Sequence, residues 1–295
     1  MAGEMQETKL APARPQIRMT RLARFRTGQL YCIAGRPAGE AEALFGKAAG
    51  PEGHGHNYRL LVSATGPVDP ATGMVINIKR VDEDIKRRIV EPLDHARIDR
   101  VWPEFQTNYP TAENLALAML RRLPAAWPTE KGNAARLTGV RLYEDDFLYA
   151  EVETVKPNIV RLTTSIEFAA SHRLNNPAFS AEENRALYGK CNNEHGHGHN
   201  YVAEITVAGE VDPQTGTIVH LEQLEKLLKT EIDGQFDHKN LNVDLPYFQD
   251  RVASAENIAV TIWNILAPKI ERAKLWRVRL YENPRSYFDY RGPDA

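Results

Sequence analysis

The chain has few cysteines and no long hydrophobic run. Two cysteines, Cys32 and Cys191, occur in 295 residues, which excludes a disulfide framework and fits a reducing compartment. No stretch approaches 18 uninterrupted apolar residues, and the first residues lack the apolar core of a signal peptide. We therefore expect a cytoplasmic protein that does not interact with membranes.

An excess of charge of one sign is also missing. Lys and Arg total 37 against 39 Asp and Glu, a formal net charge of −2, so no global positive field would gather a polyanion. Nucleic acid is therefore not an expected partner. Hydrophobic residues make up 42% of the chain and charged residues 26%, as in folded globular proteins. This composition is compatible with a protein that binds a small molecule.

The chain does contain an internal repeat. Residues 44–58 read LFGKAAGPEGHGHNY and residues 187–201 read LYGKCNNEHGHGHNY, with 9 of 15 positions identical at a constant offset of 143. The offset holds without a gap as far as Asn114 and Asn257, after which the first copy carries five extra residues around 128–132. A repeat of this length indicates two copies of one structural unit.

We divide the chain accordingly into a flexible tail and two homologous domains. The tail is predicted over 1–19, the first domain over 20–155 and the second over 158–295. Each copy shows strands, then two helices, then strands. This order predicts an α+β fold in which each domain is an antiparallel sheet with two helices on one face. In the second copy we expect strands at 200–211, 276–282 and 286–290, and helices at 221–232 and 258–266.

The densest group of candidate functional residues is His195-Gly-His197-Gly-His199, which leads into the strand at Asn200. Residues two apart on a strand point to the same face, so His197 and His199 can converge on one ion. His172, on the preceding strand, is a third candidate, and three imidazoles are a typical zinc site with one open position. His195 could instead face away, and a polar turn without metal is the alternative for the whole motif.

Three other segments carry groups that could act on a substrate. Cys191, beside Lys190, is either a small buried side chain or a thiol that accepts a proton. The adjacent pair Asp237-His238 is either a surface feature or a proton relay. Glu282 is either a solvated edge carboxylate or a group that binds paired N–H donors of a guanidine-like ring.

Together these segments resemble one family. FAASHR, GKCNNEHGHGHNY, VDPQTG, FDHKNL, AEN and LYE occur in this order and look like the 6-pyruvoyl-tetrahydropterin synthase family of the tunnelling-fold superfamily. The resemblance implies a zinc-dependent lyase that eliminates triphosphate from 7,8-dihydroneopterin triphosphate. It also implies His172, His197 and His199 as zinc ligands.

The resemblance further implies the roles of the remaining residues. Cys191 is expected to be the general base, with Asp237 and His238 completing the proton-transfer group. Glu282 is expected to anchor the pterin ring, and we also predict that Glu256, in the AEN segment, binds substrate. The residues that bind the triphosphate are not identified by the resemblance, and Lys190 and Arg173 are candidates.

Two related products and one non-catalytic role stay open. The spacing Cys191-x5-His197-x-His199 is similar to the spacing in pyruvoyl synthases. The shorter spacing Cys191-x3-His195-x-His197 is similar to that in the 6-carboxytetrahydropterin synthases of queuosine biosynthesis. We favour the longer spacing, because an asparagine and an aromatic residue follow His199. A non-catalytic pterin-binding scaffold is the third possibility.

The first copy departs from the pattern at two positions. Gln29 stands where the second copy has His172, and Ala48 stands where it has Cys191, although His54, His56 and Glu144 are kept. Two imidazoles and an amide make a weak zinc site, and alanine takes no proton. We therefore expect the first copy to be catalytically inactive and the chain to hold one zinc ion.

The resemblance also implies assembly. Single-domain members of the family form hexamers with sites between subunits, and their sheets pair edge to edge into barrels. Three two-domain chains would supply six domains, so we expect a homo-oligomer, first of all a trimer.

Overall fold

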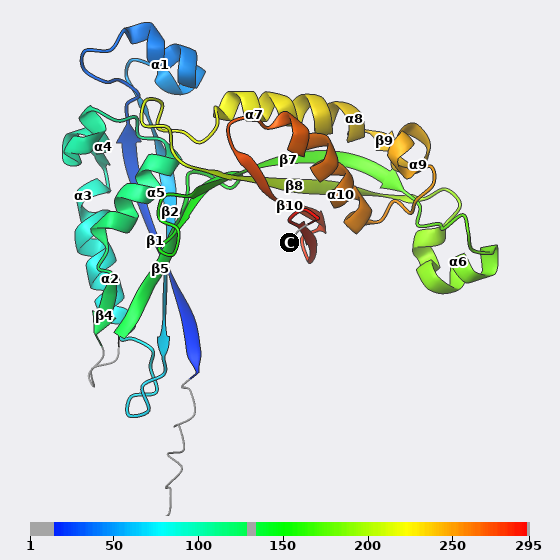
Figure 1. Cartoon of the computed structure of the whole chain (residues 1–295), viewed down its shortest axis with the longest axis horizontal. Coiled ribbons are helices and arrows are strands. Elements are labelled where there is room, and N and C mark those ends of the chain that lie inside the picture. The colour runs from blue at the N-terminus through cyan, green and yellow to red at the C-terminus, as the bar shows by residue number, and fades with distance from the viewer. Residues whose placement is uncertain (1–14, 129–133, 294–295) are drawn as a thin grey trace, which may run out of the picture.

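The structure, a computed structural model, describes residues 15–128 and 134–293. Most of the predicted tail and of the predicted insertion, residues 1–14 and 129–133, therefore lies outside the described residues. Residues 16–19, which we assigned to the tail, belong to the first strand. The repeat is visible in three dimensions as two lobes, one per copy, that meet at an angle (Figure 1).

The strands of both copies join in one sheet with the order β11-β10-β8-β7-β6-β5-β2-β1-β3, while β4 pairs with β5 and β9 with β7. Copy one contributes β1 (Gln16–Gln29), β2 (His54–Pro67), β3 (Ala96–Arg97), β4 (Ala126–Pro128), β5 (Ala134–Tyr143) and β6 (Leu148–Glu153). Copy two contributes β7 (Val160–His172), β8 (His197–Gly209), β9 (Lys239–Asn240), β10 (Lys274–Asn283) and β11 (Ser286–Tyr290). The halves meet where β6 pairs antiparallel with β7.

The helices also repeat. Copy one has α1 (Ala38–Phe45), α2 (Ile78–Ile85), α3 (Glu91–Leu93), α4 (Ile98–Val101) and α5 (Ala112–Arg122). Copy two has α6 (Ala181–Tyr188), α7 (Leu221–Leu228), α8 (Gly234–Phe236), α9 (Leu241–Asp244) and α10 (Ala255–Leu266). A π-helical turn follows α2 and α7 at 86–90 and 229–233, and 3-10 turns lie at 46–49, 103–106, 189–192, 246–248 and 267–269. The helix expected over 221–232 is thus α7 continued by a π turn.

The turn after β2 shows how the sequence ends a strand. The Asp69 side chain accepts a hydrogen bond from the backbone N–H of Ala71 at 2.8 Å, and the Asp69 carbonyl accepts one from Gly73 at 2.7 Å. Gly73 has a φ of +69°, which suits glycine because it has no Cβ. The same turn recurs after β8, where Gly216 has a φ of +73°. The repeated DPxTG sequence therefore sets the end of both hairpin strands.

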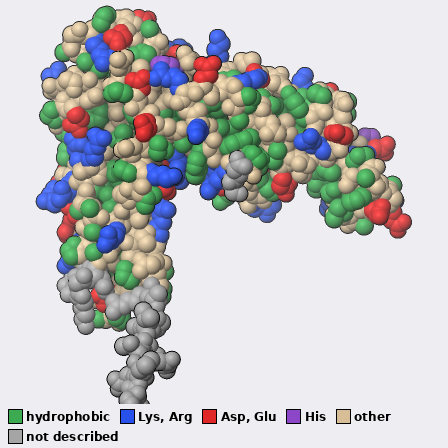
Figure 2. Space-filling view, viewed as in Figure 1, with side chains coloured by type: hydrophobic (Ala, Val, Ile, Leu, Met, Phe, Trp, Pro, Cys, Tyr) green, Lys and Arg blue, Asp and Glu red, His purple; other side chains and the backbone are tan. Residues whose placement is uncertain are grey.

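The surface carries charges of both signs. On the face shown in Figure 2, Lys and Arg side chains are interspersed with Asp and Glu side chains, in keeping with the balanced composition. Among the described helices, none is long and apolar enough to cross a membrane.

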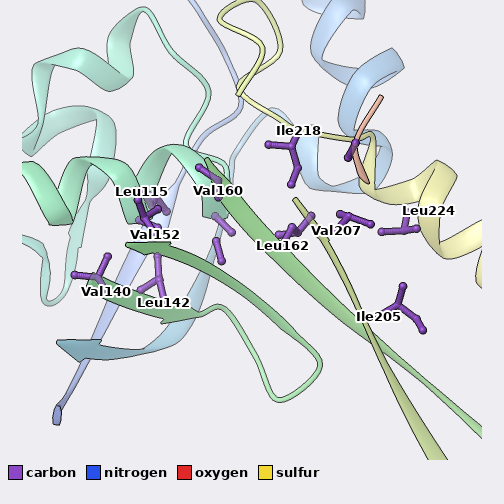
Figure 3. Close-up of a cluster of buried hydrophobic side chains, with 14 of the residues drawn as sticks. Leu115, Val140, Leu142, Val152, Val160, Leu162, Ile205, Val207, Ile218 and Leu224 are labelled. Carbon is purple, nitrogen blue, oxygen red and sulfur yellow. The ribbon is translucent and has the colours of Figure 1, made fainter. Parts of the chain in front are cut away.

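One hydrophobic core runs through both lobes. Side chains of the sheet and of the covering helices pack in one cluster across the β6–β7 junction (Figure 3). Leu115 on α5, Val152 on β6 and Val160 on β7 are fully or almost fully buried in it. Helix amphipathicity explains this packing, since α5 and α10 turn their apolar stripes to the sheet. The observed α+β architecture confirms the predicted fold class.

Candidate metal and substrate site

The pairing of β7 with β8 brings the three predicted zinc ligands together. His172 lies directly opposite His197, and Ala170 lies opposite His199. The three imidazoles form a cluster in which one ring nitrogen of each lies within 4.8 Å of the others. The Nε2 atoms of His172 and His197 are 3.2 Å apart.

The ring of His172 is held by groups that the sequence analysis did not predict. Its Nδ1 lies 2.6 Å from the carbonyl oxygen of Ala253 and 3.4 Å from the hydroxyl of Tyr201. A carbonyl accepts only, so Nδ1 carries the proton and Nε2 presents its lone pair to the cluster. Such a partner commonly orients a metal-binding imidazole. Tyr201 ends the repeated motif, which is the signal that could have indicated its role.

The surroundings of His172 and His197 favour the neutral form of these two imidazoles. Burial lowers the pKa of His172, and burial together with the neighbouring His199 lowers the pKa of His197. Two buried ring nitrogens, Nδ1 of His197 and Nε2 of His199, have no hydrogen-bond partner among the described residues. Neutral imidazoles with unused nitrogens are what Zn²⁺ binds, so the cluster fits a metal ion.

The two glutamates predicted to bind substrate lie at different places. Glu282, near the end of β10, has its Oε1 3.7 Å from Nε2 of both His172 and His199. Glu256, in the first turn of α10, is exposed. The structure thus brings Glu282 to the metal cluster and leaves Glu256 open to solvent in the single chain.

Asp237 and His238 form the predicted pair. Oδ2 of Asp237 is 2.7 Å from Nδ1 of His238, and its Oδ1 accepts a hydrogen bond from the backbone N–H of Ala169. Both hydrogen bonds lower the pKa of Asp237, and the one from Ala169 has the larger effect. His238 has a φ of +55° and an exposed ring, and it lines a groove together with His199. The pair is therefore open to a molecule bound beside the histidines.

Cys191 lies in the 3-10 turn 189–192 and is half-buried. Lys190 and Arg173 line one pocket beside this turn, with Arg185 adding a third cation. His195 is exposed and is not part of the histidine cluster. Its position agrees with the longer Cys-x5-His-x-His spacing.

The first copy repeats this architecture with different contacts. The Tyr58 hydroxyl donates to Oε1 of Gln29 at 2.7 Å, which turns the amide nitrogen of Gln29 toward Nε2 of His54 at 2.9 Å. The Nε2 atom of His54, which a metal ion would use as its ligand, is therefore already hydrogen-bonded to the amide of Gln29.

His56 and Glu144 form the rest of this second cluster. Oε1 of Glu144 lies 3.0 Å from Nε2 of His56. Burial alone would lower the pKa of His56, but the hydrogen bond and the charge of Glu144 raise it. His54, His56 and Glu144 are close enough to hold an ion, but an ion at His56 would have to displace the proton that Glu144 favours there.

The fold and the site define a protein with two homologous α+β domains and a three-histidine cluster that suits a metal. The family model for 6-pyruvoyl tetrahydropterin synthase matches residues 31–155 and again residues 161–293. The chain therefore belongs to this family, in tandem form, which confirms the resemblance seen in the sequence and the expectation of an enzyme of this type.

Individual relatives match one domain each. The 6-pyruvoyl tetrahydrobiopterin synthase of Homo sapiens is 45% identical over 132 residues, 45% of this chain and 91% of the relative. The 6-carboxy-5,6,7,8-tetrahydropterin synthase of Rickettsia bellii is 28% identical over 44% of this chain and 99% of the relative. The solved 6-pyruvoyl tetrahydropterin synthase of Caenorhabditis elegans is 37% identical over 45% of this chain and 96% of that one, with a TM-score of 0.44. These relatives are pterin synthases.

Proposed function

We propose that the second domain is a zinc-dependent lyase that converts 7,8-dihydroneopterin triphosphate to 6-pyruvoyl-tetrahydropterin and triphosphate. The observation that carries the proposal is the cluster of His172, His197 and His199 in the half that also keeps Cys191. The 45% identity to a relative named as a 6-pyruvoyl synthase supports the product.

These three imidazoles would hold the zinc ion. When bound, zinc supplies a Lewis acid that acidifies a C–H bond next to the substrate's side-chain hydroxyls. Nδ1–H of His172 stays on the Ala253 carbonyl, which fixes the ring while the substrate binds. Glu282 lies beside the cluster, and its carboxylate would accept hydrogen bonds from the N–H edge of the pterin.

Cys191, in the turn just ahead of the histidines, takes the activated proton as the general base. The His238 ring, hydrogen-bonded through Nδ1 to Asp237, returns a proton to the side chain as triphosphate leaves. Arg173, Arg185 and Lys190 around one pocket supply the positive charge that a triphosphate requires.

The carboxy synthase is the second candidate, supported by relatives such as that of Rickettsia bellii. Product analysis separates the two. The purified, zinc-supplemented chain is incubated with 7,8-dihydroneopterin triphosphate, and the products are identified by mass spectrometry. The pyruvoyl product with released triphosphate supports the proposal, the carboxy product favours the second candidate, and binding without turnover indicates a scaffold.

A further inference from the structure

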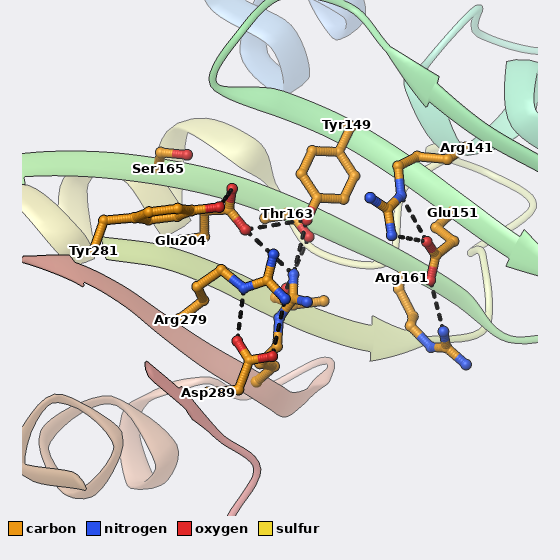
Figure 4. A network of polar contacts seen from close by, with 12 residues as sticks. Arg141, Tyr149, Glu151, Arg161, Thr163, Ser165, Glu204, Arg279, Tyr281 and Asp289 are labelled. Atoms are coloured by element: carbon orange, nitrogen blue, oxygen red, sulfur yellow. Dashed lines mark hydrogen bonds and ion pairs between the residues drawn. The ribbon is translucent and has the colours of Figure 1, made fainter. Parts of the chain in front are cut away.

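Polar contacts fix the two halves of the chain relative to one another. In the network across the junction of β6 and β7, Glu151 accepts hydrogen bonds from Arg141 of its own half and from Arg161 of the other, each at 2.7 Å (Figure 4). Elsewhere between the halves, Oε1 of Glu113 accepts a hydrogen bond at 3.2 Å from the backbone N–H of Ile218. Polar networks whose members all have partners hold the elements that carry them in one arrangement.

The turn that carries Cys191 has a smaller network of this kind. The turn, residues 189–192, lies between α6 and β8, so no α-helix or strand includes Cys191. Asn192, the last residue of the turn, is only 6% exposed. Its Nδ2 donates hydrogen bonds to the carbonyl oxygen of Leu174 at 2.7 Å and to Oδ1 of Asn175 at 3.0 Å. Both hydrogens of the buried amide are therefore used.

Further hydrogen bonds join the same two segments. The backbone N–H of Leu174 donates to the carbonyl oxygen of Cys191 at 2.9 Å. Nε of Arg173 donates to the carbonyl oxygen of Asn192 at 3.1 Å. Arg173 and Leu174 directly follow His172, the last residue of β7. The turn is thus tied to the end of the strand that supplies one histidine of the cluster.

The segment after His172 is itself held in place. Oδ1 of Asn242, in α9, accepts a hydrogen bond from the backbone N–H of Arg173 at 2.7 Å, and Nδ2 of Asn242 donates to the carbonyl oxygen of Arg173 at 3.0 Å. The ring of His172 is held by the carbonyl oxygen of Ala253. The Cys191 turn is therefore bound to a segment that α9 fixes from the other side.

The first copy, which lacks the thiol, also lacks the side chains that make these hydrogen bonds. At the constant offset, Ala49 and Leu30 stand in place of Asn192 and Arg173. Neither an alanine nor a leucine side chain can donate a hydrogen bond. The corresponding turn of the first copy packs instead in a small apolar cluster around Tyr31. The polar side chains therefore occur in the half that has the thiol.

We propose that Asn192 is a positioning residue for Cys191. Its buried amide holds the turn against the segment after His172 and so fixes where the thiol lies relative to the histidine cluster. Asn192 acts through Cys191 and does not bind the substrate. The effect on turnover rests on the proposed role of Cys191 as general base, whereas the placement of the turn does not depend on that role.

Replacing Asn192 by alanine tests the proposal on the full, zinc-supplemented chain. We expect the kcat of N192A to fall about 10- to 100-fold, because a base that is displaced by about 1 Å loses its alignment with the proton. KM should change little, since the base acts in the transition state. The zinc content should equal that of the wild type, because the histidines lie on β7 and β8 and not on the turn.

Alkylation of Cys191 supplies a measurement that needs no substrate. A C32A background removes the exposed second thiol. In this background, iodoacetamide should modify Cys191 faster when Asn192 is also replaced by alanine, since a released turn exposes a half-buried thiol. Mass spectrometry of the digested protein measures the rate. Slower turnover together with faster alkylation and unchanged zinc is the signature of a displaced thiol in a folded domain.

N193A is the matched control. Asn193 is the next residue in the chain but is exposed, and its Oδ1 accepts a hydrogen bond at 3.3 Å from the backbone N–H of His195. Because this contact does not reach the segment after His172, we expect N193A to keep the kcat and the alkylation rate of the wild type. Equal effects of N192A and N193A would overturn the proposal.

Other results would overturn it as well. They are wild-type turnover in N192A, an unchanged alkylation rate, and loss of zinc from a folded N192A, which would assign Asn192 to the histidine cluster. If circular dichroism shows that N192A does not fold, N175A removes one of the two acceptors of the Asn192 amide and should change both rates in the same directions by a smaller amount.

Failure of the proposed lyase gives a different result. A wild-type chain that does not turn over 7,8-dihydroneopterin triphosphate would refute the proposed reaction. The alkylation rates and zinc contents of N192A and N193A would still decide whether Asn192 holds the turn.

Discussion

The side-chain amide of Gln29 lies 2.9 Å from Nε2 of His54, at the position where His172 faces His197 in the other half. An amide and an imidazole joined by a hydrogen bond stand on β1 and β2, where the second half has two clustered imidazoles on the equivalent strands β7 and β8. The first domain can therefore serve as an internal control for the histidine site of the second domain.

Replacing Gln29 by histidine should restore a third imidazole to the first copy. We expect one zinc ion per chain in the wild type and two in Q29H, because the new ring can orient on the Tyr58 hydroxyl as His172 does on Tyr201. Metal analysis after dialysis measures this, with Q29A as the control that stays at one. Two tightly bound ions in the wild type would contradict the inactive first copy.

Replacing Cys191 by alanine should abolish turnover and leave zinc bound. Loss of a general base costs roughly 10²- to 10⁴-fold in rate, and the thiol is not among the clustered ligands. Turnover and metal content are measured on the same sample, with exposed Cys32→Ala as the control. Adding A48C to C191A should restore nothing. Near-normal turnover of C191A would remove Cys191 from the base role.

Replacing His172 by alanine should lose both metal and activity. Two remaining imidazoles bind zinc weakly, so the zinc content after dialysis should fall from one toward zero. H195A is the matched control, since His195 is exposed outside the cluster, and it should keep its metal. Unchanged zinc in H172A would refute the ligand assignment.

The buried carboxyl of Glu113 should make stability depend on pH. Burial raises its pKa from 4.5 to about 7, so the folded state holds more protons than the unfolded state between these values. The free energy of unfolding therefore falls as pH rises through this window, by at most about 3 kcal/mol. E113Q keeps an oxygen for the Ile218 N–H and should lose this dependence.

Urea unfolding midpoints at pH 5 and pH 8 measure the effect. E182Q is the matched control, since Glu182 holds the same first-turn position on α6 but is exposed. We expect its pH profile to follow the wild type. Parallel profiles for wild type and E113Q would show that Glu113 does not titrate in this range.

The sequence predicts the repeated elements well because their signals are local. Strand β11 was expected with its observed bounds, Ser286–Tyr290. Strand β8 begins three residues earlier than expected, at His197, and its counterpart β2 begins at the equivalent residue His54. The HGH residues pair with the neighbouring strand, and a Cβ at Gly55 would lie 2.8 Å from the carbonyl oxygen of Thr27. Hydrophobic periodicity carries no information on so close a backbone approach.

The surroundings of the site residues could not be predicted in the same way. The carbonyl oxygen that holds His172 belongs to Ala253, 81 residues away in the sequence. Because every residue has a backbone carbonyl, the residue type does not indicate which one will contact the histidine. Glu113 and Glu256 lie at the same position of the two AEN segments, one in each copy, yet Glu113 is buried and Glu256 is exposed. The difference comes from the neighbouring half, which a local motif does not encode.

The short turn at residues 154–159, between β6 and β7, has a consequence for chemical equilibrium. It makes the pairing of the domain that carries His172 with the domain that carries Gln29 intramolecular, so that their contact forms at a high effective concentration whatever the dilution of the protein. Two separately encoded domains would instead mix at random, and their ratio would follow their relative expression. The covalent turn fixes the ratio at one to one and gives every histidine-rich domain the same glutamine-bearing neighbour.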